Sequence, residues 1–595
     1  MTSISISSSS SSSNSKLSSN SNSNSNSVQK PRFRNNIMPE DIDDSNQNKL
    51  NFKKGESNGK NNNQPNINSI QNDELYSDLF NSKLIKTFIS ELYSLRPNDE
   101  ILKENPLEFS NFDIPDHIIS YSFLESIATI PKNWINEIKS KHSKVINLIN
   151  SKINDFNLIS KNDGAVIIGG YENDLTWLAL ISTRLFRRAG GVLPIEVMLP
   201  TYDDYIKDKE ICDLYLPQLN AKCIIMKDLL ESSKIDNGNI KINSYISDNF
   251  NLIKRELAIL LSKFENVLYL SPENVMLKPM ESTIFEKKFY NDYGLLVWGD
   301  YGPRFTLPSF YEIANIEIKN TRSSIYGLPL TDSLINDNSN NNKFKNLDNE
   351  MFKNQINYHD LLNSLPYKQS DASEIIINKR KHLNTLFLSM YYNLNGPKVY
   401  YILLTGKYNG EHGSKETILA ASHVLNNNYY LVKTNVEGNG YWYDGKFFGV
   451  SMLQFDAIVD FFSYEGFINK FSNRRKGIEI TQSKFQKWLK ESSERRSPLF
   501  LNINNPPLKP IELIKDNIVI KENGDRIKLI SDSSYFDPLF ETDIWRVMND
   551  YICYLSLDSN YVNSKLGKPN SKQRDSFCKG EMKEHLLWIA SLNDN

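Results

Sequence analysis

Short apolar runs alternate with amphipathic segments through the middle of this 595-residue chain. The run Ala165-Val166-Ile167-Ile168 ends in Gly169-Gly170, and a helical pattern over 175–188 follows it. Further strand-like runs and one more helical pattern follow at 195–199, 223–226, 251–263 (helical), 267–270 and 294–298. This alternation predicts an α/β fold with a mostly parallel central sheet covered by helices on both faces. Such sheets bind ligands at the carboxyl ends of their strands, where the strand order reverses.

Changes in composition divide the chain into four parts, as the usual domain size leads us to expect for this length. Residues 1–72 are rich in Ser and Asn, with too few apolar side chains to order, and predict a disordered tail. Helical periodicity over 73–161 predicts a helical stem, and the strand–helix alternation places the main domain at 162–515. A polar insertion at 321–365 interrupts that domain, and 516–595 is predicted to form a C-terminal lobe.

Charge and cysteine content exclude several classes of protein. The 69 basic side chains nearly balance the 71 acidic ones, which argues against nucleic acid as a partner. No apolar stretch approaches ~20 residues, and no basic-then-apolar leader is present, so we expect no transmembrane anchor or signal peptide in this sequence. Four cysteines are too few for a disulfide-built scaffold and leave two disulfides or four free thiols open.

Several segments occur in a fixed order along the predicted main domain. They read Gly-Ala-Val-Ile-Ile-Gly-Gly at 164–170, Trp-Leu-Ala-Leu-Ile at 177–181, Leu-Pro-Ile-Glu-Val at 193–197, Leu-Pro-Gln-Leu-Asn-Ala-Lys-Cys at 216–223, Leu-Ala-Ile-Leu-Leu-Ser-Lys-Phe-Glu-Asn-Val-Leu at 257–268, Gly-Leu-Leu-Val-Trp at 294–298, Tyr-Tyr-Asn-Leu-Asn-Gly-Pro at 391–397 and Lys-Glu-Thr at 415–417. As an ordered set they resemble the fungal Golgi α-mannosyltransferases of glycosyltransferase family 71.

The resemblance implies a GT-A-like nucleotide-sugar-binding fold in the lumen of the Golgi. It implies GDP-mannose as donor, a bridging Mn²⁺ or Mg²⁺, and retaining transfer of mannose, with α-1,2 linkage, to mannan or glycoprotein outer chains. Other mannosyltransferases are the implied protein partners. A departing diphosphate develops negative charge, which a cation held by carboxylates neutralises.

The sequence departs from the family at the positions that hold the cation. An Asp-x-Asp motif is expected after the strand at 267–270, but this chain has Ser271-Pro272-Glu273, so that only Glu273 remains as an acidic metal ligand. A family His is replaced by Asn502. Because affinity for hard cations follows ligand charge, these changes predict a weakened metal site or none.

Three acids are the candidates for catalysis. Asp300 follows the strand at 294–298 and matches an acid on the acceptor side of the family's cleft, although a turn-capping role is an alternative. Asp371 and Glu374 replace the family's Glu-x-Gly-Gln, which reads Asp371-Ala372-Ser373-Glu374 here. The resemblance therefore places acids at these positions in a rearranged order.

The donor-binding candidates are two glycines and three basic residues. Gly169 and Gly170 would let the backbone approach a nucleotide, although such a pair is common after strands. Lys254 and Arg255 match a basic position facing the donor diphosphate, with an exposed helix face as the alternative. Lys415 lies in Gly413-Ser414-Lys415-Glu416-Thr417, which corresponds to the family's Gly-Asp-Lys-Glu-Thr.

Three hypotheses of function follow from these residues. The first is an active α-mannosyltransferase in which Glu273, the diphosphate and water hold the cation. The second is a catalytically impaired homologue that binds glycan, nucleotide sugar or a partner transferase. The third is a metal-independent transferase in which Lys254, Arg255 and Lys415 replace the cation.

Overall fold

The computed structural model describes most of the chain beyond the predicted tail, which falls almost wholly outside the described residues. The described residues are 70–98, 108–109, 118–156, 162–232, 240–280, 284–330, 353–407, 412–472, 480–531, 533 and 535–592. The centre of the predicted insertion, 331–352, also lies outside them. Within these ranges, no helix is long and apolar enough to cross a bilayer.

A seven-stranded sheet forms the centre of the fold, as the strand–helix alternation predicts. Its strands lie in the order β14 (Tyr430–Leu431), β8 (Leu295–Pro303), β13 (Lys368–Asn378), β6 (Asn266–Leu270), β3 (Asp163–Ile168), β4 (Ile195–Leu199) and β5 (Ala221–Ile225). All neighbouring pairs are parallel except those that β13 makes with β6 and β8, which are antiparallel. The fold is therefore α/β with a mostly parallel central sheet.

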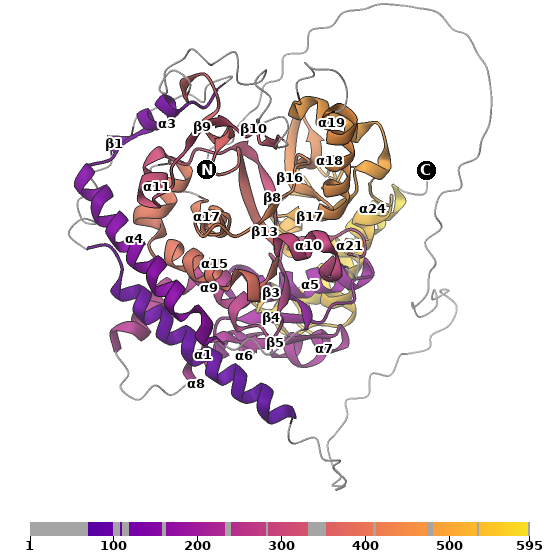
Figure 1. Cartoon of the computed structure of the whole chain (residues 1–595). Coiled ribbons are helices and arrows are strands. Elements are labelled where there is room, and N and C mark those ends of the chain that lie inside the picture. The colour runs from indigo at the N-terminus through magenta and orange to yellow at the C-terminus, as the bar shows by residue number, and fades with distance from the viewer. Residues whose placement is uncertain are drawn as a thin grey trace, which may run out of the picture. The chain divides into compact units, whose positions relative to one another are not determined.

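Helices cover both faces of this sheet because its strands are apolar on both sides. Ala165 and Ile167 of β3 share one core with α5 (Leu175–Arg188), whereas Val166 and Ile168 share another with α9 (Ile240–Leu261). In Figure 1, α4 and α15 lie on one side of the strands, and α5, α21 and α24 lie on the other. The helices of the first 160 residues are α1 (Ile70–Ser94), α3 (Tyr121–Ile127) and α4 (Lys132–Lys152).

The remaining described helices fill in around these two cores. They are α6 (Tyr202–Lys207), α7 (Leu216–Gln218), α8 (Met226–Ser232), α10 (Lys288–Tyr293), α11 (Pro308–Ile313), α15 (Lys379–Leu394), α16 (Tyr401–Thr405), α17 (Thr417–Val424), α18 (Ala457–Ser472), α19 (Gln482–Lys490), α20 (Pro510–Lys515), α21 (Phe540–Asn549), α22 (Asn560–Leu566), α23 (Lys572–Phe577) and α24 (Lys583–Ser591). Ile85 of α1 and Ile138 of α4 belong to the same core as Leu257 of α9. The predicted stem therefore packs directly against the main domain.

A second, four-stranded antiparallel sheet packs on the α5 side. Its order is β15 (Glu437–Tyr443), β16 (Lys446–Phe455), β17 (Pro498–Ile503) and β7 (Asn274–Met276). Short two-stranded pairings join β1 (Glu108–Phe109) to β2 (Ala128–Thr129), β9 (Lys319–Arg322) to β12 (Leu361–Leu362), and β10 (Ser324–Ile325) to β11 (Leu328–Pro329). The flanks of the predicted polar insertion thus form ordered strands.

All four cysteines are joined in disulfides. Cys212 pairs with Cys223, and Cys553 pairs with Cys578, each with Cα atoms 5.5 Å apart. Of the two possibilities that the sequence leaves open, the structure has the disulfide-bonded form.

Candidate functional site

The strand order reverses between β3 and β6, and the candidate site residues gather at the carboxyl ends of these strands. The chain runs from β3 outward to β4 and β5, and then returns to pair β6 with the other side of β3. Because β13 is antiparallel, its first half lies at the same edge, with Glu374 opposite Leu270 and Asp371 opposite Trp298. This edge is where doubly wound sheets bind their ligands.

A cavity of about 280 Å³ opens beside the ends of β3 and β4. Gly169 and Gly170 form part of its wall, and its lysines come from three different helices: Lys86 of α1, Lys227 of α8 and Lys254 of α9. Leu175, Leu230 and Phe250 add apolar surface to the lining. Glu172, Asp203 and Asp204 line it as well, so the cavity holds three carboxylates beside its three ammonium groups. A partly apolar pocket with both kinds of charge suits an organic ligand that carries phosphates and hydroxyl groups.

Both of these positions in the cavity wall favour glycine, for different reasons. A Cβ at Gly169 would lie 2.7 Å from Leu199 Cδ2, and Gly170 has a φ of +135°, which side chains rarely adopt. Their N–H groups are already used, because Gly169 donates to the Met198 carbonyl and Gly170 to Thr176 Oγ1, both at 2.9 Å. The glycines therefore give a ligand room rather than hydrogen bonds.

Arg255 points away from the cavity that Lys254 lines. Its guanidinium is buried and donates to Glu256 Oε1 at 2.7 Å and to the Ser414 carbonyl at 2.8 Å. It also donates to Thr417 Oγ1 at 3.1 Å. Arg255 thus ties α9 to the segment that carries Lys415, and links the cavity to the acids beyond it.

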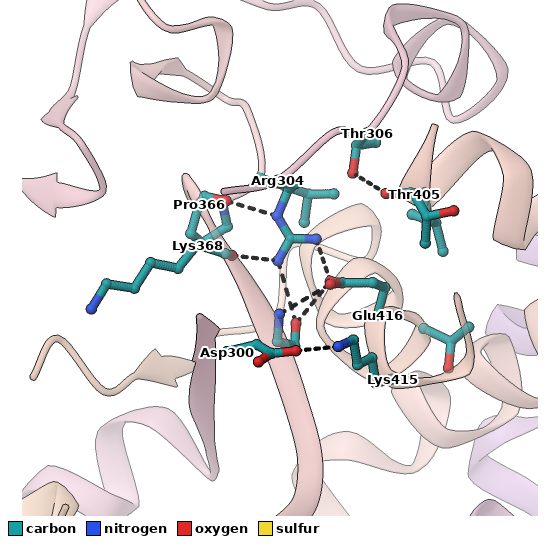
Figure 2. Close-up of polar contacts among 12 residues, drawn as sticks. Asp300, Arg304, Thr306, Pro366, Lys368, Thr405, Lys415 and Glu416 are labelled. Carbon is teal, nitrogen blue, oxygen red and sulfur yellow. Dashed lines mark hydrogen bonds and ion pairs between the residues drawn. The ribbon is translucent and has the colours of Figure 1, made fainter. Parts of the chain in front are cut away.

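An ion pair between Lys415 Nζ and Asp300 Oδ2 lies on the open side of this segment (Figure 2). Asp300 Oδ1 also accepts the Tyr301 N–H at 2.7 Å, which fixes the carboxylate within the second half of β8. Both side chains of the pair keep some exposure to solvent.

Arg304 is a buried arginine close to this pair, and the sequence analysis did not identify it as a site residue. Arg304 donates to the carbonyls of Pro366 and Lys368 at 2.7 and 2.8 Å, and forms an ion pair with Glu416 (Figure 2). Glu416 in turn accepts the Ser370 N–H at 3.1 Å. The network fastens the start of β13 to the 3₁₀ turn Gly413–Glu416, which carries Lys415. No sequence pattern distinguishes a buried arginine of this kind from an exposed one.

Asp371 and Glu374 are buried acids of β13. Asp371 accepts the Ser373 N–H at 3.1 Å and Gln454 Nε2 at 3.1 Å, and burial raises its pKa. Burial, and then the charge of Asp371, raise the pKa of Glu374 well above its usual range. Asn274 Nδ2 donates to Glu374 Oε2 at 3.2 Å. Burial therefore disfavours the ionised form of Glu374, whereas Asp300 is paired with Lys415 and keeps some exposure to solvent.

The positions expected to hold a metal carry one carboxylate. The Ser271 hydroxyl donates to Glu273, and Asn502 lies directly opposite Asn274 in the β17–β7 pair. Asn274 Oδ1 and Asn502 Oδ1 are buried oxygens without a hydrogen-bond partner. In the part of the chain that the structure describes, no group of three or more His, Cys, Asp or Glu side chains is arranged to hold a metal ion. These residues do not fit a cation site of the family's type.

Comparison with known proteins gives consistent results. Residues 162–456 match a family described as "Mannosyltransferase putative". The α-1,2-mannosyltransferase MNN21 of Candida albicans is 31% identical over 81% of this chain and 70% of its own length. MNN23 of the same organism is 29% identical over 72% of each chain, and MNN2 of Saccharomyces cerevisiae is 28% identical over 73% of this chain and 71% of its own length.

The fold and these matches define a glycosyltransferase, and the chain belongs to the mannosyltransferase family. Its relatives within that family are the Mnn-type α-1,2-mannosyltransferases of fungi. The resemblance that the ordered sequence segments carry is thereby confirmed.

Proposed function

We propose that this protein is an α-1,2-mannosyltransferase that transfers mannose from GDP-mannose to a mannoside of a mannan or glycoprotein outer chain. The observation that carries the proposal is the cavity at the point where the strand order reverses, which Lys254 of α9 lines while the neighbouring Arg255 holds the turn that carries Lys415. We interpret the sheet, with its antiparallel strand β13, as a GT-A-like nucleotide-sugar fold. The linkage follows from the names of the relatives.

In this proposal the cavity binds the nucleoside diphosphate. Phe250 and the two leucines offer surface to the base, while Lys254 and Lys227 face its phosphates. An ammonium group is strongly attracted to phosphate at short range in a site shielded from water. Lys254 therefore contributes both to donor affinity and to the charge balance of the departing GDP.

Asp300 and Lys415 act on the sugar side. The acceptor hydroxyl donates a hydrogen bond to Asp300 as its oxygen attacks C1 of mannose. The bond from C1 to the diphosphate breaks, and the hydroxyl proton passes to the released phosphate oxygen. Lys415 orients Asp300 through their ion pair.

We derive no step through a metal ion. The family resemblance implies Mn²⁺ or Mg²⁺ on the donor diphosphate, but Ser271, Glu273 and Asn502 supply a single charge at those positions. Titration of GDP into the protein with and without Mn²⁺ measures how much the ion adds to donor affinity.

We further propose that the protein works in the Golgi lumen. Its two disulfides support this location, because disulfides persist in oxidising compartments of the secretory pathway. Association with other mannosyltransferases stays a prediction, to be checked by co-purification from cells.

The test of the proposed function is turnover by the full chain. GDP-mannose and an α-mannobiose acceptor should give GDP and a product that α-1,2-mannosidase shortens again. Lys254→Ala should raise KM for GDP-mannose about tenfold, since one charge-assisted contact is lost. Asp300→Asn should lower kcat by about a hundredfold, the scale of rate loss when an attacking group is misplaced.

Lys288→Ala is the matched control, because Lys288 is an exposed lysine of α10 outside the cleft. Absence of turnover by folded protein with any mannoside would contradict the proposal. In that case, retention of GDP-mannose or glycan binding would identify the protein as the catalytically impaired homologue.

A further inference from the structure

A hairpin formed by β15 and β16 carries exposed aromatic side chains close to the cleft. Trp442 and Phe447 are directly opposite each other near its tip, with ring centroids 5.5 Å apart. The Trp442 side chain is 71% exposed and that of Phe447 is 46% exposed. Aromatic surface of this size left in water is not explained by folding, and such patches usually bind something.

The two faces of the hairpin differ. On one face, Tyr441 stacks on Phe448 and is partly buried against the core, and Asn439 Nδ2 donates to the Ser531 carbonyl at 3.2 Å. Side chains alternate between faces along a strand, which places Gly438 and Trp442 on the opposite face. Gly440, between them, is buried at a register shift, and a Cβ there would lie 1.9 Å from the Phe448 carbonyl oxygen. Trp442 therefore projects from the face that is not fastened to the body of the protein.

The open face leads back to Tyr301, the neighbour of Asp300 in the chain. A Cβ at Gly438 would lie 2.9 Å from the hydroxyl of Tyr301, so that the Tyr301 ring borders the same face as Trp442. Tyr301 is 57% exposed and directly follows Asp300. Gly438 and Trp442 are four residues apart, or about 13 Å at ~3.3 Å per residue. The surface from Tyr301 to Trp442, which we call the aromatic lane, thus begins at the proposed acceptor position.

Glycines leave part of the surface of this lane without side chains. Gly438 and Gly449 are exposed, and no atom beyond the neighbouring Phe447 ring approaches a Cβ position at Gly449 within 4 Å. A surface of this kind, with aromatic rings at each end, can hold a chain of pyranose rings. Each such ring has a face of C–H groups that stacks on an aromatic ring, while its hydroxyls stay in contact with water.

We propose that the aromatic lane binds the acceptor oligomannoside beyond the residue that is being extended. This inference rests on the proposed function, since it assigns the acceptor of the same site. The terminal mannose lies at Asp300 and Tyr301, and the preceding units run along the hairpin to Trp442 and Phe447. The lane makes the enzyme favour long acceptors over short ones.

The test compares two acceptor lengths in the full chain. Trp442→Ala should raise KM about tenfold for an α-mannopentaose acceptor, the scale of one lost aromatic contact, and leave kinetics with α-mannobiose unchanged. Trp442→Phe should recover most of the loss. Tyr554→Ala is the control, because Tyr554 is 73% exposed in the C-terminal lobe, outside the lane.

Calorimetric titration of mannopentaose without donor separates this inference from the proposed function. Weaker pentaose binding by Trp442→Ala supports the lane even if no variant turns over GDP-mannose. Equal affinity of wild type and Trp442→Ala for pentaose would overturn the lane, whether or not the protein is an active transferase. A change from dimer to monomer in Trp442→Ala, with unchanged glycan affinity, would also overturn it and assign the surface to a second copy.

Discussion

At the scale of single residues, the carboxyl groups at the edge of the sheet have different surroundings. Asp300 is held by Lys415 at the open side of the cleft, whereas Glu374 is buried beside Asp371 and Asn274. Burial disfavours the charged form of a carboxyl group, and a nearby negative charge adds to that effect. The ionised form is therefore disfavoured at Asp371 and Glu374, both of which are buried.

Glu374→Gln should stabilise the protein in a pH-dependent way. The pKa of Glu374 is raised in the folded state, so the unfolded chain ionises first as the pH rises above about 4.5. Wild type then loses about 1.4 kcal/mol per pH unit until the folded pKa is reached, and a non-titrating Gln avoids this loss. Thermal unfolding should show equal Tm values for the two proteins near pH 4, and a higher Tm for Glu374→Gln at pH 8.

The control for this prediction is Glu581→Gln, which changes an exposed glutamate and should leave the Tm difference independent of pH. A lower Tm for Glu374→Gln at pH 8 would mean that the folded protein needs the Glu374 carboxylate in its ionised form. The same curves thus report the charge state of this acid.

At the scale of elements, the Arg304 network positions the catalytic turn. It fastens β13 to the 3₁₀ turn Gly413–Glu416, and Arg255 fastens the same turn to α9. The guanidinium of Arg304 is fully buried, so its charge is compensated only by these partners. The position of Lys415 next to Asp300 therefore depends on groups that do not touch substrate.

Glu416→Ala should destabilise the protein by about 3–5 kcal/mol, because it leaves the Arg304 charge buried without a counter-ion. Chemical denaturation followed by tryptophan fluorescence measures this loss. Asp292→Ala is the matched control: it removes the exposed Lys288–Asp292 pair and should cost less than about 1 kcal/mol. A loss below about 1 kcal/mol for Glu416→Ala would show that the ion pair does not hold the turn.

Several elements could be predicted from the sequence because their periodicity is local. The helix at 175–188 and the strand at 195–199 have the predicted bounds. The strand β13 was missed, since its apolar run 375–377 leads straight into a helix and its antiparallel direction depends on distant partners. The β15–β16 hairpin was also missed, because glycines and exposed aromatics along it break the alternation expected of a strand.

The candidate site, like the fold, could be predicted only in part. The apolar runs and the family motifs located Gly169, Gly170, Lys254, Asp300 and Lys415 at one edge of the sheet. The local sequence does not indicate that Lys254 lines the cavity while Arg255 points away from it. The orientation of Arg255 depends on its hydrogen bonds to Glu256 and Ser414. Tertiary partners therefore decide which of two adjacent basic residues faces the ligand.

At the scale of the whole molecule, segments far apart in the sequence share their cores. Trp177 of α5 packs on Tyr561 of α22 at 4.8 Å between ring centroids, and its indole N–H donates to the Leu508 carbonyl at 2.9 Å. The C-terminal helices thus pack against α5, whose first residue, Leu175, lines the cavity. Damage to the C-terminal lobe is expected to reach the donor site through this contact.

The two disulfides give a prediction about the stability of the whole molecule. Cys553–Cys578 joins the residues around α21 to those before α24 across a separation of 25 residues, and should stabilise the protein by about 3–4 kcal/mol by restricting the unfolded chain. Cys553→Ser/Cys578→Ser should therefore lower Tm more than Cys212→Ser/Cys223→Ser, whose separation is 11 residues. A variant with all four serines should have a Tm that dithiothreitol does not change. If dithiothreitol leaves the wild-type Tm unchanged as well, the cysteines are free thiols and the argument for an oxidising compartment fails.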